Sequence, residues 1–223
     1  MNNAPAIATT ANAADTARPA IQVNDLGKRF NREWIFRGLN YTFQPGYTYA
    51  VTGANGSGKS TLLQVLWGQM PPSKGTVKYI SGDVEVPHES IFRQIAIATP
   101  YMDLIDEFTL REQLDFHFKL RKPRGNMTVT AMMERMYLTD ARDKYISNFS
   151  SGMRQRVKLA LAFFTEANLL FLDEPGTNLD HRAFDWYLHE LQQLPAHASV
   201  FIASNQPSEY PANAHKIDIM QFK

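Results

Sequence analysis

The sequence predicts an α/β protein with a parallel β-sheet core, an antiparallel β subdomain and an inserted helical subdomain. The runs LLFL at 169–172 and VFIA at 200–203 are apolar throughout, as is typical of parallel strands covered on both faces. The aromatic and β-branched runs before residue 52 follow one another without a helical pattern between them, which favours antiparallel strands. From 108 to 156 helical patterns dominate and strand-like runs are absent, which marks the insertion.

The individual elements follow from local composition and periodicity. Short runs rich in β-branched and aromatic residues predict strands at 21–26, 34–43, 47–52, 77–80, 95–98, 169–172, 199–204 and 217–222. Apolar residues at helical spacing predict helices at 60–67, 111–120, 129–136, 152–166 and 181–194. The helical subdomain is expected at about residues 103–156.

Size and composition are those of an ordinary globular chain. Its 223 residues suit one large domain or a domain with a small insert, and 44% of them are hydrophobic. A net charge of +1 argues against a generally basic nucleic-acid binder, and the lack of cysteine excludes disulfides and thiolate sites. The most apolar run, LALAFF at 159–164, is far shorter than the roughly 20 residues that span a bilayer. Residues 1–20 lack the pattern of a secretory signal and are expected to form a disordered tail.

The stretch TGANGSGKST at 52–61 predicts a phosphate-binding loop. It fits G-x-x-x-x-G-K-[ST] and stands between an expected strand and an expected helix, as that motif requires in P-loop NTPases with a RecA-like core. Backbone N–H groups of the loop and the helix N-terminus would surround the phosphates, Lys59 would hold the β- and γ-phosphates, and Ser60 would ligate Mg²⁺. The expected nucleotide-binding residues are Gly53, Ala54, Asn55, Gly56, Ser57, Gly58, Lys59, Ser60 and Thr61.

Two acids end the apolar run LLFLDEP at 169–175. A parallel sheet places the carboxyl end of this strand beside the phosphate loop, where ligands gather. Asp173 is expected in the Mg²⁺ shell, and Glu174 is expected to orient and deprotonate the attacking water.

The segment DEPGTNLD at 173–180 resembles the Walker B motif and D-loop of ABC-type ATPases. The family signature LSGGQ precedes these acids, and FSSGM at 149–153 stands in its place as a degenerate copy. Over residues 21–223 the chain is thus similar to ABC transporter ATP-binding proteins. The resemblance implies that two subunits sandwich two nucleotides head to tail, so that Ser150, Ser151 and Gly152 contact the partner subunit's ATP and Asp180 lies in the D-loop. Ser150 is also a plausible N-cap for the helix that follows.

The resemblance also implies an aromatic residue that stacks on adenine. Phe30 fits that place, with a packed sheet aromatic as the other interpretation and Trp34 as the second candidate. The family's Q-loop glutamine is replaced by Pro100 or Tyr101, and its switch histidine by Asn205. An asparagine can donate a hydrogen bond to a γ-phosphate but cannot carry a proton. These substitutions are expected to leave ATP binding intact. Hydrolysis is expected to be slow or dependent on a partner.

The expected function is that of an ATP-hydrolysing subunit that forms a homo- or heterodimer around Mg-ATP on the cytoplasmic face of a membrane. It would drive a separate membrane subunit of an export-type transporter. The alternative is a soluble ABC ATPase acting on nucleic acid or the ribosome, but no sustained heptads separate the motifs, a second ATPase domain is absent, and no nucleic-acid partner is expected. A P-loop phosphotransferase would leave the signature and D-loop unexplained. The basic cluster KLRKPR at 119–124 is interpreted as a solvated helix end, with anionic lipid or RNA as other possible partners.

Overall fold

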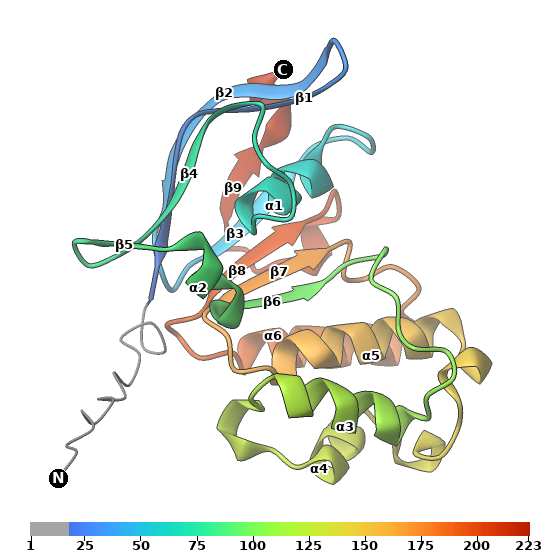
Figure 1. Ribbon diagram of the computed structural model, residues 1–223. Coiled ribbons are helices and arrows are strands. Elements are labelled where there is room, and N and C mark those ends of the chain that lie inside the picture. The colour runs from blue at the N-terminus through green and yellow to red at the C-terminus, as the bar shows by residue number, and fades with distance from the viewer. Residues whose placement is uncertain (1–17) are drawn as a thin grey trace, which may run out of the picture.

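The structure is a computed structural model that describes residues 18–223, so residues 1–17 of the expected tail lie outside the described residues. Two β-sheets and a group of helices form three layers (Figure 1). The antiparallel sheet has the order β2-β1-β4-β5, made of β2 (Glu33–Phe43), β1 (Ala20–Phe30), β4 (Lys74–Ser81) and β5 (Val84–Val86). The parallel sheet has the order β6-β7-β8-β3-β9, made of β6 (Ile95–Ala98), β7 (Leu169–Asp173), β8 (Ser199–Ala203), β3 (Thr48–Thr52) and β9 (His215–Asp218).

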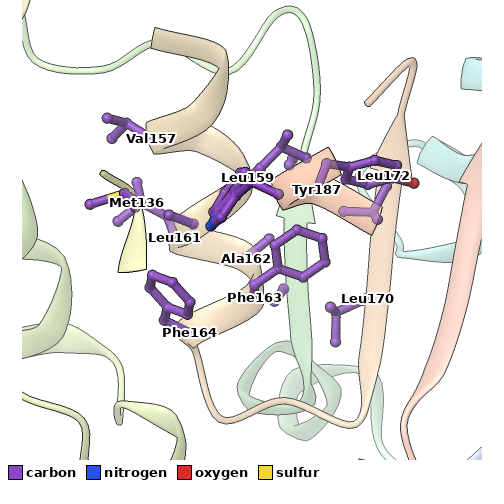
Figure 2. Close-up of a cluster of buried hydrophobic side chains, with 14 of the residues drawn as sticks. Met136, Val157, Leu159, Leu161, Ala162, Phe163, Phe164, Leu170, Leu172 and Tyr187 are labelled. Carbon is purple, nitrogen blue, oxygen red and sulfur yellow. The ribbon is translucent and has the colours of Figure 1, made fainter. Parts of the chain in front are cut away.

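The parallel sheet is buried on both faces, which confirms the prediction from its apolar strands. On β7, Leu170 and Leu172 belong to the core on the helical side, whereas Leu169 and Phe171 belong to the core shared with the antiparallel sheet. Figure 2 shows the helical side, where Phe163 and its neighbours from α5 (Ser151–Phe164) meet these strand residues. The alternation of side chains along a strand therefore builds two hydrophobic cores from one continuous apolar run.

The helices lie mainly on one side of the parallel sheet. They are α1 (Lys59–Leu66), α2 (His88–Ile91), α3 (Leu110–Leu120), α4 (Val129–Arg135), α5 and α6 (His181–Gln192). Helices α5 and α6 cover the sheet, and α3 and α4 lie further from it as the expected inserted subdomain (Figure 1). No strand interrupts the chain between β6 and β7, all of which the structure describes, although two isolated β-bridges occur there. Between residues 18 and 223, no helix combines the length and the apolar character needed to cross a bilayer.

Two details differ from the sequence-based prediction. The last strand, expected at 217–222, runs from His215 to Asp218 and gives way to a 3₁₀ helix at Ile219–Phe222. The Asp218 carboxylate accepts a 3.0 Å hydrogen bond from the Met220 N–H, so a local side-chain cap ends a strand whose apolar pattern continues. Strand β5 and helix α2 were not predicted, because elements of three and four residues are too short to show a period.

The topology brings four loops to one edge of the parallel sheet. Strands β3, β6, β7 and β8 are parallel neighbours in register, so their carboxyl ends meet at the same edge. The loops that follow them carry the phosphate-loop motif, the Pro100–Tyr101 position, the two acids and Asn205.

Candidate nucleotide site

The phosphate loop connects β3 to α1 in a tight turn. Gly53 has φ 140° and Gly58 has φ 102°, a backbone region that side chains rarely adopt. A Cβ on Gly58 would also collide with the Ile35 side chain on β2. Glycine is required at position 58, because a side chain would be strained at this φ and would overlap the Ile35 side chain. The neighbouring strand β2 therefore constrains the shape of the loop.

Lys59 lies over the phosphate loop instead of extending into solvent. Its side chain is 5% exposed, and its Nζ donates to the carbonyls of Gly53 at 3.0 Å and Ala54 at 3.1 Å. An ammonium has three N–H donors, so one remains for a phosphate oxygen. The Ser57 hydroxyl, also buried, has no hydrogen-bond partner among residues 18–223 and adds a further donor to the loop.

Ser60 and Asp173 form a pair between the start of α1 and the end of β7. The Ser60 hydroxyl donates a 2.9 Å hydrogen bond to Oδ1 of Asp173, which is 2% exposed. Burial raises the pKa of Asp173 and the Glu174 carboxylate adds to this, while the Ser60 hydrogen bond and the Lys59 charge lower it. A hydroxyl and a buried carboxylate oxygen are hard donors of the kind that Mg²⁺ prefers, so the pair fits that ion.

Glu174 stands on a sharply turned backbone. It has φ 46°, its N–H donates to the Ala203 carbonyl at 2.9 Å, and its own carbonyl accepts from the Thr177 N–H at 3.1 Å. Positive φ in a residue other than glycine is uncommon and is found at functional sites. The turn places a half-buried carboxylate next to Asp173, at the edge where the phosphate loop lies.

Asn205 follows β8 and contacts the phosphate loop directly. Its Nδ2 donates a 3.0 Å hydrogen bond to Oδ1 of Asn55, and both residues are exposed. The two side chains are 150 residues apart in sequence. The structure thus brings the position of the missing switch histidine to the loop expected to hold the phosphates.

The degenerate signature begins α5. The Ser150 hydroxyl accepts a 3.2 Å hydrogen bond from the Met153 N–H, which confirms the predicted N-cap. A Cβ on Gly152 would lie 2.8 Å from the Asn178 carbonyl oxygen, so α5 starts directly against the segment that precedes α6. Asp180 caps α6 by accepting a 2.8 Å bond from the Ala183 N–H. In the described chain, no hydrogen bond joins the exposed Ser150 and its neighbours to the phosphate loop.

The comparisons with known proteins agree with these motifs. A family model described as "ABC transporter" matches residues 36–177, more than half of the chain. The chain belongs to the ABC transporter family. It is an ATP-binding domain of that family, and such domains are ATPases.

Several relatives are ATP-binding proteins of this family. The chain is 28% identical over 204 residues to the uncharacterised ABC transporter ATP-binding protein YybJ of Bacillus subtilis, covering 91% of this chain and 88% of YybJ. It is 32% identical over 193 residues to the sulfate/thiosulfate import protein CysA of Synechococcus elongatus, covering 83% of this chain and 56% of CysA. It is 31% identical over 167 residues to the daunorubicin/doxorubicin resistance protein DrrA of Streptomyces peucetius, covering 74% and 51%. The chain therefore spans about half the length of the latter two relatives.

Solved structures of the same family share the fold. One from Pyrococcus furiosus, a putative ABC transporter ATP-binding protein, superposes with a TM-score of 0.73 at 19% identity over 91% of this chain and 98% of that one. An ATP-binding subunit of an ABC transporter gives 0.69 at 24% identity over 82% and 78%. These similarities confirm the predicted P-loop fold with its parallel core and antiparallel subdomain.

The aromatic candidates of this ABC ATPase differ in accessibility. Phe30 ends β1 with its side chain 46% exposed, and the Lys28 ammonium lies 5.5 Å from its ring centroid. Trp34 is half-buried and packs so closely on Gly27 that a Cβ there would lie 2.9 Å from the ring. The exposed Phe30 is thus the better placed of the two for stacking on a ligand.

Two residues that connect the parts of the site were not predicted from the sequence. Lys223 donates to the carbonyls of Ile35 at 2.9 Å and Ser57 at 2.7 Å, joining β2 to the phosphate loop.

Glu209 is 2% exposed, and a Cβ on Gly176 would collide with its carboxylate. Burial and the nearby Glu174 raise the pKa of Glu209, while hydrogen bonds from Ser204 and from the Gly176 N–H lower it. Neither Lys223 nor Glu209 belongs to a local sequence motif, so only their tertiary contacts show that they are part of the site.

Proposed function

We propose that this chain is an ATP-hydrolysing subunit that dimerises around ATP and drives a separate membrane subunit. One observation carries the proposal. The phosphate loop with Lys59, the Ser60–Asp173 pair and Glu174 lie together at one edge of the sheet, whereas the exposed signature at Ser150 makes no hydrogen bond to this phosphate loop. A helix N-terminus whose N-cap serine still has its O–H donor suits a γ-phosphate, and a second subunit would bring its ATP to this position.

Each residue of the half-site has a distinct role in this proposal. Lys59 and the loop N–H groups hold the β- and γ-phosphates, and Phe30 stacks on the adenine. Ser60 and Asp173 would hold Mg²⁺, which would neutralise charge on the transferring phosphoryl group. Glu174 orients the attacking water and accepts its proton. Asn205 donates a hydrogen bond from its amide to the γ-phosphate, from the position where it now meets Asn55.

The same half-site supports slow hydrolysis. Asn205 cannot carry positive charge, so the stabilisation of the transition state that a protonated histidine would give is missing. Pro100 has no side-chain donor, its carbonyl accepts a 2.8 Å hydrogen bond from Lys158, and the neighbouring Tyr101 side chain is 82% exposed. The loop after β6 therefore brings no amide side chain to the phosphates from these two positions.

The membrane subunit is proposed to dock beside Tyr101. A cavity of about 500 Å³ lies there, and its mainly apolar wall includes Trp67, Phe92, Ile97, Tyr101 and Met102. Phe92 is 53% exposed, so two aromatic rings on this face meet solvent. An apolar groove with exposed aromatic residues suits a short helix of a partner protein.

An export-type system on the cytoplasmic face is the proposed setting. The printed names of similar proteins include a Nod factor export ATP-binding protein and a cytochrome c biogenesis ATP-binding export protein, which support this direction. CysA, an import protein, is equally similar and keeps the direction open to experiment.

The first test is the molar mass of the Glu174→Gln protein in solution, measured by size exclusion with light scattering. Because this variant would bind ATP without activating water, Mg-ATP is expected to double the mass. The same protein carrying Ser150→Arg is the control and is expected to remain monomeric, since the arginine would block the signature. A Glu174→Gln protein that binds Mg-ATP but stays monomeric would rule out the homodimer.

The docking proposal has its own test. Phe92→Glu and Tyr101→Glu together are expected to release the chain from the membrane fraction of its native cells, while ATP binding persists. Tyr137→Glu, at another aromatic residue that is 57% exposed, is the matched control. Equal membrane association of the parent, the double variant and the control would contradict docking at Tyr101.

A further inference from the structure

A basic cavity lies at the edge of the parallel sheet opposite the phosphate loop. Its volume is about 670 Å³, and its wall comes from the segments that precede β1, β6, β7 and β8 and from the end of α3 with the residues that follow it. In Figure 1 this is the end of these strands opposite their arrowheads. Since β6, β7 and β8 are parallel, their amino ends meet here and their carboxyl ends meet at the nucleotide site. The cavity is therefore separate from the ATP-binding machinery.

The cavity carries a large excess of positive charge. Its cationic side chains are Arg18, Arg93, Arg121, Lys122 and Arg124. Its one carboxylate, Glu166, forms a 3.0 Å ion pair with Lys122. Across residues 18–223, none of the four arginines is within ion-pair distance of a carboxylate. For a chain with a net charge of +1, this is a local concentration of unpaired cations.

Two of these arginines are held in place by backbone carbonyls. Arg121 donates to the carbonyls of Ile95 at 2.7 Å and Arg93 at 3.3 Å. Arg124 donates to the carbonyls of Phe163 at 2.9 Å, Thr165 at 3.1 Å and Ala167 at 3.4 Å. Each guanidinium has five N–H donors in a fixed plane, so these bonds orient the group and leave three donors on Arg121 and two on Arg124 for a ligand. The cluster at 119–124, expected to be a solvated helix end, instead turns half-buried Arg121 and Arg124 into the cavity wall.

The electrostatic environment is unfavourable for more positive charge. Burial lowers the pKa of Arg121, and it lowers that of Arg124 to about 10 although the nearby Glu166 carboxylate acts in the opposite direction. At His197, which also lines the cavity, burial and then the charges of Arg18 and Arg124 lower the pKa. With one carboxylate, Glu166, among five cations, these partly buried groups carry a desolvation penalty that a bound anion would offset.

We propose that this cavity binds a phosphate-bearing anion. The planar forks of the arginines match the oxygens of a phosphate group, and several of them together suit an anion with more than one charge. A volume of about 670 Å³ lies within the range of small-molecule sites. The same phosphate chemistry occurs in soluble metabolites and in lipid headgroups, and the concave shape suits a ligand that enters the cavity.

Isothermal titration with pyrophosphate at low salt tests the site. The Lys59→Ala background is used throughout, so that the phosphate loop does not compete for the probe. Arg18→Gln and Arg93→Gln are combined as the site variant, because both side chains are exposed and Arg121 and Arg124 keep their backbone bonds. The control combines Arg111→Gln and Arg142→Gln, which remove the same charge from exposed positions on the helical subdomain.

The expected result is a loss of pyrophosphate affinity of at least tenfold in the site variant and less than twofold in the control. A second arm measures cosedimentation with phosphatidylcholine vesicles containing phosphatidylglycerol. Selective loss of vesicle binding by the site variant, without pyrophosphate binding in the parent, would place the phosphate on a lipid headgroup. Equal behaviour of the two variants with both probes, or a parent that binds neither probe, would overturn the proposal.

Discussion

The Ser60 hydroxyl donates a 2.9 Å hydrogen bond to the Asp173 carboxylate, joining two residues 113 positions apart. The bond connects the N-terminus of α1 to the carboxyl end of β7. Asp173 is buried, and its pKa is raised first by that burial. Burial thus penalises the charged form of this carboxylate, and a cation bound beside it would offset that penalty.

Asp173→Asn is expected to stabilise the nucleotide-free protein and to remove the dependence of ATP binding on Mg²⁺. A carboxyl with a raised folded-state pKa contributes stability below its unfolded pKa and loses it as the pH rises, so its charged form is unfavourable at pH 7. Asparagine keeps the Oδ1 acceptor for Ser60 without the charge. Thermal unfolding and ATP titrations with Mg²⁺ or EDTA measure both effects. Asp180→Asn, at a helix cap that asparagine also favours, should change neither, and a lower Tm for Asp173→Asn would contradict the account.

Asn205→Ala is expected to lower the rate of ATP turnover by roughly fivefold to tenfold, the effect of losing one hydrogen bond worth about 1 kcal/mol in the transition state. Nucleotide affinity should change little, because the phosphate loop remains intact. Steady-state hydrolysis and ATP titration separate the two quantities. Gln206→Ala, at the next exposed position, is the control. Unchanged turnover in Asn205→Ala would show that Asn205 plays no part at the γ-phosphate.

The parts of the site that could be predicted from the sequence are those encoded by short spacings. The phosphate loop needs glycines and Lys59 within a few residues, and Asp173 follows directly from an apolar strand. The N-cap at Ser150 and the two-sided burial of β7 also depend on neighbouring residues alone. For these features, the structure that the neighbouring residues predict is the one that the folded protein adopts.

The rest depends on tertiary contacts that a single sequence does not specify. Asn205 meets Asn55 across 150 residues, and Arg124 reaches the Phe163 carbonyl across 39. The sequence of the basic cluster at 119–124 therefore predicts a solvated helix end, whereas in the structure the segments that precede the strands lie beside it. Glu209 lies in a polar segment that predicts exposure, and its burial follows from its contacts with Gly176 and Tyr187, which are distant in the sequence.

Gly152→Ala is expected to lower stability and to prevent ATP-dependent dimerisation. The new methyl group would lie 2.8 Å from the Asn178 carbonyl, and Asn178 is itself held at φ 63°. Overpacking of this kind costs about 1–3 kcal/mol and would lower the Tm by several degrees. Thermal unfolding and light scattering in the Glu174→Gln background measure the two effects. Ser151→Ala, exposed in the first turn of α5, should unfold at the parent temperature. A Gly152→Ala protein with parental Tm and normal dimerisation would contradict the close approach.

His117 is expected to make folding stability fall between about pH 6.5 and pH 4. Its Nε2 lies 2.9 Å from the Thr165 hydroxyl, which donates its own proton to the Leu161 carbonyl, so the imidazole is the donor. Burial, then the charge of Arg121, lowers the pKa of His117 to about 4. The unfolded chain would take up a proton near pH 6.5 and the folded chain only near pH 4.

The stabilisation by neutral His117 is therefore complete above pH 6.5 and lost progressively as the pH falls through about 4. Urea unfolding at pH 7.5, 6.0 and 5.0 should show the advantage of the parent over His117→Gln shrinking by roughly 1 kcal/mol per pH unit across that window. The glutamine cannot titrate there, so its own curve is flatter. His181→Gln, at an exposed ring at the start of α6, should follow the parent at every pH. Parallel curves for the parent and His117→Gln would mean that the imidazole is protonated equally easily in the folded and unfolded chains.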